Sequence, residues 1–116
     1  MLDRPIKAGI DAATIVKVFN EAALGQVMSL KVRLPATYLC GDFEPRFSLA
    51  LPRKDLGLAQ ESARGTDTPM SLSPLCEKEM VEAMARGWSD RDASIFLALQ
   101  EERSSIQVRL PPAAIN

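Results

Sequence analysis

Three residues near the middle of the chain have the types and spacing that a ligand pocket needs. The aromatic residue Phe47 stands seven positions before a charged pair, Lys54 and Asp55. The pair leads directly into an apolar segment, residues 56–59, that is expected to be helical. A pocket typically combines apolar walls with a few polar groups that orient the ligand, and this arrangement offers both.

The same three residues also have a purely structural interpretation. Asp55 can stabilise the positive end of a helix, while Lys54 is solvated and Phe47 belongs to the core. A lysine at that end of a helix is electrostatically unfavourable, which weakens this interpretation without removing it. Residue types alone therefore leave both interpretations open.

The rest of the sequence argues against several kinds of chemistry. The chain has no histidine, so it lacks the usual general base at neutral pH and any Ser–His or Cys–His pair. It contains neither a G-x-G-x-x-G motif nor a P-loop. Asp90 and Asp92 are two positions apart and do not share a helix face, so we expect no metal site. Cys40 and Cys76 have no neighbours that would complete one, and we expect reduced structural thiols.

The composition is that of one ordinary globular domain. The 116 residues are 47% hydrophobic and 25% charged, with a net charge of −1 and both signs mixed along the chain. This pattern gives no electrostatic footprint for nucleic acid or anionic lipid. No apolar run reaches membrane-spanning length, and no signal-peptide pattern opens the chain. We therefore expect a cytoplasmic protein.

The apolar spacing predicts a largely helical chain. Asp11 is a good N-cap for a first helix, in which Ile15, Val16, Phe19 and Ala23 follow at helical spacing before Gly25 interrupts the pattern. The apolar residues of segment 27–34 nearly alternate, which also fits a strand, but no second strand offers a partner. We predict a helix there, ended by Pro35.

Proline and glycine delimit two further helices. Pro52 stands where a first helical residue should, and Gly65 is predicted to be the C′ residue of that helix. After a polar linker, residues 66–73, Pro74 begins another helix that Gly87 closes. The buried stripe of this second helix is predicted to contain Leu75 or Cys76, Met80, Val81 and Met84.

A last helix is predicted after Ser89 and Asp92, which resemble a capping box with aspartate in the glutamate position. Its buried residues would be Ile95, Phe96 and Leu99. The predicted fold is all-α, with about five to six helices in residues 1–103 followed by an extended tail, residues 104–116.

Taken in order, these landmarks resemble the C-terminal helical domain of the β-hydroxyacid dehydrogenases, which is similar to the C-terminal domain of 6-phosphogluconate dehydrogenase. The family includes 3-hydroxyisobutyrate dehydrogenase, tartronate semialdehyde reductase and the glyoxylate and succinic semialdehyde reductases. The resemblance covers residues 8–94. The matching motifs are Ala8-Gly9-Ile10-Asp11, Gly41-Asp42-Phe43-x-Pro45-x-Phe47, Lys54-Asp55-Leu56-x-Leu58-Ala59, Pro69, and Gly87 with Asp92-Ala93-Ser94. Ser89 departs from the pattern, because the family usually has a second glycine there.

The resemblance implies roles for the three candidate residues. Lys54 would reach the nicotinamide end of NAD or NADP, Asp55 would support the catalytic lysine, and Phe47 would line the substrate pocket. In the family, the catalytic lysine and the dinucleotide-binding motif belong to an N-terminal Rossmann domain and the long helix after it. This sequence contains neither. We therefore expect a substrate-pocket and dimerisation domain that is inactive, and binds no cofactor, by itself.

Two alternatives stay open. The chain could be one subunit of a split dehydrogenase that a Rossmann protein completes in trans. It could also be a stand-alone helical interaction module without enzymatic activity. In each case we expect a homodimer or higher homo-oligomer, because apolar helix faces that lack the family's long helix need another cover. The tail, with Ile106, Val108 and Leu110, is the segment expected to cross between chains.

Overall fold

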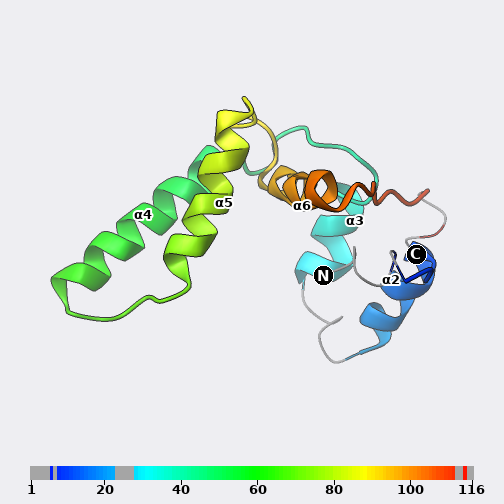
Figure 1. Ribbon diagram of the computed structural model, residues 1–116, viewed down its shortest axis with the longest axis horizontal. Helices are drawn as coiled ribbons and strands as arrows, with labels where there is room; N and C mark the ends of the chain where they lie inside the picture. Colours follow the sequence, from blue (N-terminus) through cyan, green and yellow to red (C-terminus); the bar gives the residue numbers. More distant parts are fainter. Residues whose placement is uncertain (1–5, 7, 23–27, 112–113, 115–116) are drawn as a thin grey trace. The chain divides into compact units, whose positions relative to one another are not determined.

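The computed structural model describes residue 6, residues 8–22, residues 28–111 and residue 114, and they are mostly helical (Figure 1). In chain order the helices are α2 (Ala12–Glu21), the π-helix η2 (Ser29–Arg33), α3 (Leu34–Ala36), α4 (Ala50–Gly65), α5 (Ser73–Ala85), the 3₁₀-helix η3 (Ala93–Phe96) and α6 (Leu97–Ser104). Within these described ranges no β-strand forms, and Ser48 and Asp92 make an isolated antiparallel bridge. The all-α prediction is confirmed. A search of the same residues finds no helix with the length and apolar character needed to span a membrane.

The chain divides into two compact units. The first unit comprises Met1–Phe43 and Gln100–Asn116, and the second comprises Glu44–Leu99. Each unit is described below by itself.

In the first unit, α2 begins as predicted. The carboxylate of Asp11 accepts hydrogen bonds from the backbone N–H of Thr14 at 3.1 Å and from its hydroxyl at 3.3 Å. These bonds satisfy donors that the helix start leaves free. Ile15 and Val16 are buried and Phe19 is half-buried, whereas Ala23 lies outside the described residues, so the predicted apolar face of α2 is confirmed at its first two positions.

The segment before Pro35 is helical from Met28 onward, but Pro35 does not end it; residue 27 lies outside the described residues. The helix widens over η2, where the N–H of Leu34 donates to the carbonyl of Ser29, five residues back. A proline ring clashes with the carbonyl four residues before it in an α-helix. The wider π turn moves that carbonyl aside, and the helix continues through Pro35 to Ala36.

The chain after α6 is held against residues 38–43 of the same unit. Val108 and Leu110 are buried, and the N–H of Leu110 donates to the carbonyl of Leu39 at 2.8 Å. Residues 106–111 contain no helix, whereas Ser104, the first residue of the predicted tail, still belongs to α6. Both apolar side chains are covered within one chain, and the exchange of this segment between chains stays a prediction.

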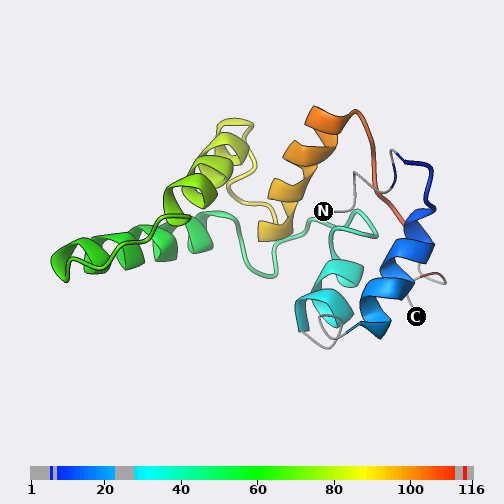
Figure 2. The same cartoon turned by 60° about the horizontal axis from the view of Figure 1, so that its bottom comes forward.

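In the second unit, α4 and α5 lie side by side and are joined by residues 66–72 (Figures 1 and 2). Arg53 and Glu77 form a salt bridge of 2.7 Å between the two helices. The fully buried residue of α5 is Ala83, whereas Leu75 and Val81 are 62% and 47% exposed. The predicted stripe of α5 is therefore wrong at these two positions, because the inward face centres on the small alanine.

Both predicted ends of α4 are also wrong. The helix begins at Ala50, which makes Pro52 its third residue rather than its first. Gly65 is still helical, and Asp67 adopts the left-handed conformation, with φ 51°. The N–H of Thr68 then reaches the carbonyl of Ala63 at 2.9 Å, which completes a Schellman cap. Aspartate tolerates this conformation better than most residues, so glycine was not required.

The end of α5 follows the prediction. Gly87 has φ 81°, and its N–H donates to the carbonyl of Met84 at 2.9 Å. Only glycine adopts this backbone conformation without steric cost. Pro74 is the second residue of the helix, one position from its predicted place.

Candidate functional site

The charged pair of Lys54 and Asp55 is exposed to solvent on helix α4. Lys54 and Asp55 are the fifth and sixth residues of α4, and both side chains are exposed. Neither side chain has a hydrogen bond or ion pair with any residue that the structure describes. The pair opens the second turn, directly beside the first, because the helix starts at Ala50. The dipole effect is confined to the first turn, so helix stabilisation by Asp55 is a weak explanation for this pair.

Phe47 lies in the loop before α4 and is half-buried. Its backbone is held from both sides. The N–H of Phe47 donates to Oδ2 of Asp92 at 3.3 Å, and its carbonyl accepts from the N–H of Ala93 at 2.8 Å. The backbone from which the aromatic ring projects is therefore held by residues about 45 positions further along the chain.

Asp92 is the residue that sequence reasoning placed in the wrong role. Its side chain is fully buried, with 0% exposure. Oδ2 accepts the N–H groups of Arg46 and Phe47, each at 3.3 Å, and Oδ1 accepts the N–H of Ser94 at 3.0 Å. Burial by itself raises the pKa of Asp92, but the hydrogen bonds from Ser94, Phe47 and Arg46 favour the charged form and lower the pKa below its ordinary value.

The predicted capping box is wrong for the same reason. Asp92 is itself the N-cap of η3, and its side chain does not reach back to Ser89. The carbonyl of Ser89 instead accepts the N–H of Ala50. An aspartate that binds the N–H two residues later is a common local motif, and the run Asp92-Ala93-Ser94 was the signal that could have found this cap.

Backbone contacts between two short segments fix the entry into α4. Besides the bonds of Phe47, the N–H of Leu49 donates to the carbonyl of Arg91 at 2.9 Å, and that of Ala50 donates to Ser89 at 3.1 Å. Leu49 is fully buried at this junction. The junction therefore fixes both Phe47 and the start of the helix that carries Lys54.

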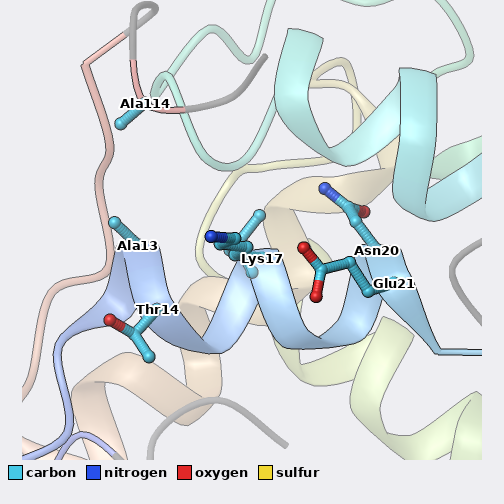
Figure 3. A pocket seen from close by; sticks show the side chains of 7 residues that line it. Ala13, Thr14, Lys17, Asn20, Glu21 and Ala114 are labelled. Atoms are coloured by element: carbon cyan, nitrogen blue, oxygen red, sulfur yellow. The ribbon is translucent and has the colours of Figure 1, made fainter.

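A hollow of about 470 Å³ lies in the other unit, along α2 (Figure 3). Lys17, Asn20 and Glu21 line it from the helix, and Ala114 lies across from Ala13. None of the three predicted site residues belongs to this hollow, so it is not the predicted pocket.

The described residues contain no group of three or more His, Cys, Asp or Glu side chains that could hold a metal ion. Cys40 and Cys76 are both free thiols and both exposed.

Comparison with known proteins places this helical chain among the hydroxyacid dehydrogenases. The sequence matches, over residues 5–99, the family described as NAD-binding of NADP-dependent 3-hydroxyisobutyrate dehydrogenase. The chain belongs to this family. The match includes all the motifs on which the resemblance rested.

Individual relatives agree. The mitochondrial 3-hydroxyisobutyrate dehydrogenases of Mus musculus and Homo sapiens are 31% and 30% identical to the chain over 104 and 106 residues, which are 84% and 85% of this chain and 31% of each relative. The 2-(hydroxymethyl)glutarate dehydrogenase of Eubacterium barkeri is 22% identical, over 89% of this chain and 34% of its own. The chain thus spans about a third of the length of these relatives.

A solved structure supports the fold. The 3-hydroxyisobutyrate dehydrogenase from Salmonella typhimurium superposes with a TM-score of 0.69 and 23% identity, over 84% of this chain and 34% of that one. At this identity the likeness establishes the fold of the helical region.

The family description implies a nicotinamide dinucleotide, and the residues present fit it only in part. Lys54 is an exposed cation that pairs with none of the described residues, which suits one contact to an anionic or amide group. A dinucleotide also needs a glycine-rich turn at a helix N-terminus to receive its pyrophosphate. The 116 residues contain no such turn.

Proposed function

We propose that this chain is the substrate-pocket and dimerisation domain of an NAD(P)-dependent 3-hydroxyacid dehydrogenase, and that the 116 residues are inactive by themselves. The observation that carries the proposal is that Lys54 and Asp55 are exposed on α4 and pair with no residue that the structure describes, within the region that matches the family. A solvated pair without a structural partner is available to a ligand.

Each candidate residue has a distinct role in the proposal. Lys54 holds the nicotinamide end of the cofactor, Asp55 supports a catalytic lysine, and Phe47 forms an apolar wall against the substrate. The bound cofactor supplies the hydride chemistry. The residues of this chain orient the reactants and exclude water at one side of the pocket.

The inactivity of the chain alone follows from what its sequence contains. It has neither the glycine-rich turn nor a lysine in the context that the family's catalytic lysine requires. Completion by a Rossmann protein in trans would restore both, and so the split-enzyme alternative belongs to the same proposal. The cytoplasm is the compartment we propose, on the basis of the two free thiols.

A hybrid enzyme tests the site. Residues 5–99 replace the matching region of the mouse 3-hydroxyisobutyrate dehydrogenase, and NAD(P)H formation from 3-hydroxyisobutyrate is followed. We expect turnover by the hybrid and none by the 116-residue chain. Lys54→Gln should reduce kcat/KM of the hybrid about a hundredfold, because a charge-assisted contact in a closed site contributes roughly 3 kcal/mol.

Lys78→Gln is the matched control, since Lys78 is an equally exposed lysine on α5. It should leave kcat/KM unchanged. Equal kcat/KM values for the two variants would remove Lys54 from the site. Turnover by the isolated chain would contradict the proposed inactivity.

Dimerisation is proposed from large apolar side chains that the second unit leaves in solvent. Leu58, Leu72, Leu75 and Val81 are between 47% and 73% exposed. Burying one such side chain contributes roughly 1.5–3 kcal/mol, so a second copy is a favourable cover. Sedimentation equilibrium at micromolar concentration should give twice the mass of one chain, and Leu72→Lys combined with Leu75→Lys should give the mass of one. A monomeric wild type would contradict the proposal.

A further inference from the structure

We propose that Asp92 is a positioning residue whose buried carboxylate holds the backbone of Phe47 and thereby sets the apolar wall of the substrate pocket. This inference rests on the proposed function, since it concerns the same pocket. It assigns a role to a residue that does not itself touch the substrate.

The first argument is the environment of the carboxylate. Asp92 is fully buried, and in the described part of the chain no cation pairs with it. Leaving a carboxylate uncompensated in such a place is strongly unfavourable. The three N–H groups of Arg46, Phe47 and Ser94 provide the compensation.

The second argument is that capping alone does not explain these bonds. One oxygen, Oδ1, caps η3 through Ser94, and serine or asparagine would do the same. The other oxygen, Oδ2, receives two N–H groups from residues 46 and 45 positions earlier in the chain. The second carboxylate oxygen is therefore committed to the loop that carries Phe47.

The third argument concerns how narrowly the loop is defined. Phe47 is bound through its N–H to the side chain of Asp92 and through its carbonyl to the N–H of Ala93. These two bonds hold the backbone of Phe47 on both sides, so the point from which the ring projects cannot shift without breaking one of them. A half-buried ring held in this way is preorganised for contact with a ligand.

Asparagine at position 92 separates the two functions of the carboxylate. Its single carbonyl oxygen can accept from Ser94 or from the Arg46–Phe47 pair, but its amide group then faces N–H donors on the other side. Asp92→Asn therefore keeps the volume of the side chain and loses part of the grip on the loop.

Two controls isolate that loss. The Ser94 hydroxyl is buried and has no partner in hydrogen-bonding geometry among the described residues, although its proximity favours the charged form of Asp92. Ser94→Ala removes this hydroxyl and keeps all three N–H bonds to Asp92. Glu61→Gly lowers the stability of exposed α4 through helix propensity, at a position that does not contact Asp92.

The experiment measures kcat and KM for 3-hydroxyisobutyrate in the hybrid enzyme and in its variants, because the proposed pocket is complete only beside a dinucleotide domain. Amide exchange at Arg46 and Phe47 is measured by NMR on the 116-residue chain with the same substitutions. For Asp92→Asn we expect about tenfold faster exchange at these two amides and an about tenfold lower kcat/KM, the loss that one good hydrogen bond represents. Ser94→Ala and Glu61→Gly should retain the kcat/KM of the unsubstituted hybrid.

The outcomes separate the two proposals. A hybrid enzyme without turnover overturns the proposed pocket, and this inference with it. An active hybrid whose Asp92→Asn variant matches Glu61→Gly in amide exchange and in kcat/KM overturns the positioning role alone.

Discussion

The two units each bury a carboxylate, and they stabilise it by different means. In the first unit, Glu101 accepts the hydroxyl of Tyr38 and the N–H of Val108, both at 2.8 Å, and forms an ion pair with Arg109 at 2.7 Å. In the second unit, Asp92 receives only backbone N–H groups. The first carboxylate thus depends on neighbouring side chains, whereas the second depends on the path of the backbone.

This difference assigns the two carboxylates different tasks. The Glu101 cluster, which consists of Tyr38, Phe43, Glu101 and Arg109, joins the segment after α6 to residues 38–43; the guanidinium of Arg109 lies 5.2 Å and 5.4 Å from the centres of the two aromatic rings. Such a cluster stabilises a fold. A carboxylate that binds only N–H groups instead fixes the exact course of a loop, here the loop before α4.

The largest effect should come from breaking the Glu101 cluster. Glu101→Ala leaves the Tyr38 hydroxyl, the Val108 N–H and the Arg109 guanidinium without their shared acceptor. We expect the free energy of unfolding to fall by about 3 kcal/mol, because several buried donors and a partly buried cation lose their partner. Urea unfolding measures the change.

Glu61→Ala is the control for that measurement, because Glu61 is exposed on α4 and forms no ion pair in the described chain. Its unfolding free energy should stay within about 0.5 kcal/mol of wild type. Similar losses for the two alanine variants would mean that the cluster contributes no more than an exposed glutamate.

Asp92→Asn should destabilise the chain less, by about 1–2 kcal/mol, since its amide keeps one acceptor and loses the other. The comparison predicts a local consequence that Glu101→Ala should lack. Only the Asp92 variant should speed amide exchange at Arg46 and Phe47 beyond the global change. If Glu101→Ala exposes these amides equally, the two carboxylates do not have separate tasks.

A smaller effect is expected from Arg109→Lys. Lysine keeps the charge opposite Glu101 but loses the planar group that lies over Tyr38 and Phe43, together with the second contact to Glu101 at 3.3 Å. We expect a loss of about 1 kcal/mol. Arg86→Lys provides a control, because Arg86 also lies over an aromatic ring, that of Trp88, but at the exposed end of α5. A greater loss at position 86 would contradict the assignment of stability to the Glu101 cluster.

Local signals in the sequence predicted local features well. Asp11 caps α2 and Gly87 closes α5, because each depends on residues within one helical turn. The helix ends predicted from Pro35, Pro52 and Gly65 are wrong. The helix widens before Pro35, α4 starts two residues before Pro52, and the left-handed Asp67 ends α4 after Gly65. Nothing in the local pattern decides between these outcomes.

The residues of the candidate site could be predicted from the sequence, but the hydrogen bonds that hold the backbone of Phe47 could not. Phe47, Lys54 and Asp55 could be chosen from their spacing and from the family resemblance. The role of Asp92 could not, because it depends on contacts across about 45 positions and not on helical or strand periodicity. Their roles in catalysis stay predictions that the hybrid enzyme tests.

The last comparison concerns pH. The pKa of Asp92 is lowered in the folded chain, whereas in the unfolded chain it takes its ordinary value near 3.8. A carboxylate with a depressed folded pKa stabilises the fold above the unfolded pKa, and that contribution is lost as the pH falls through the folded pKa. We therefore expect the unfolding free energy of wild type to fall as the solution is acidified below about pH 5.

Asp92→Asn removes the titrating group from the loop, so its unfolding free energy should fall less steeply over the same range. Chemical denaturation at several acidic pH values gives the two curves, with Ser94→Ala as the variant that retains the carboxylate and should follow wild type more closely. If the Asp92→Asn and wild-type curves run parallel, the N–H donors do not stabilise the charged form of the carboxylate. The distinction between a charge held by the backbone and a charge held by side chains would then be wrong for this protein.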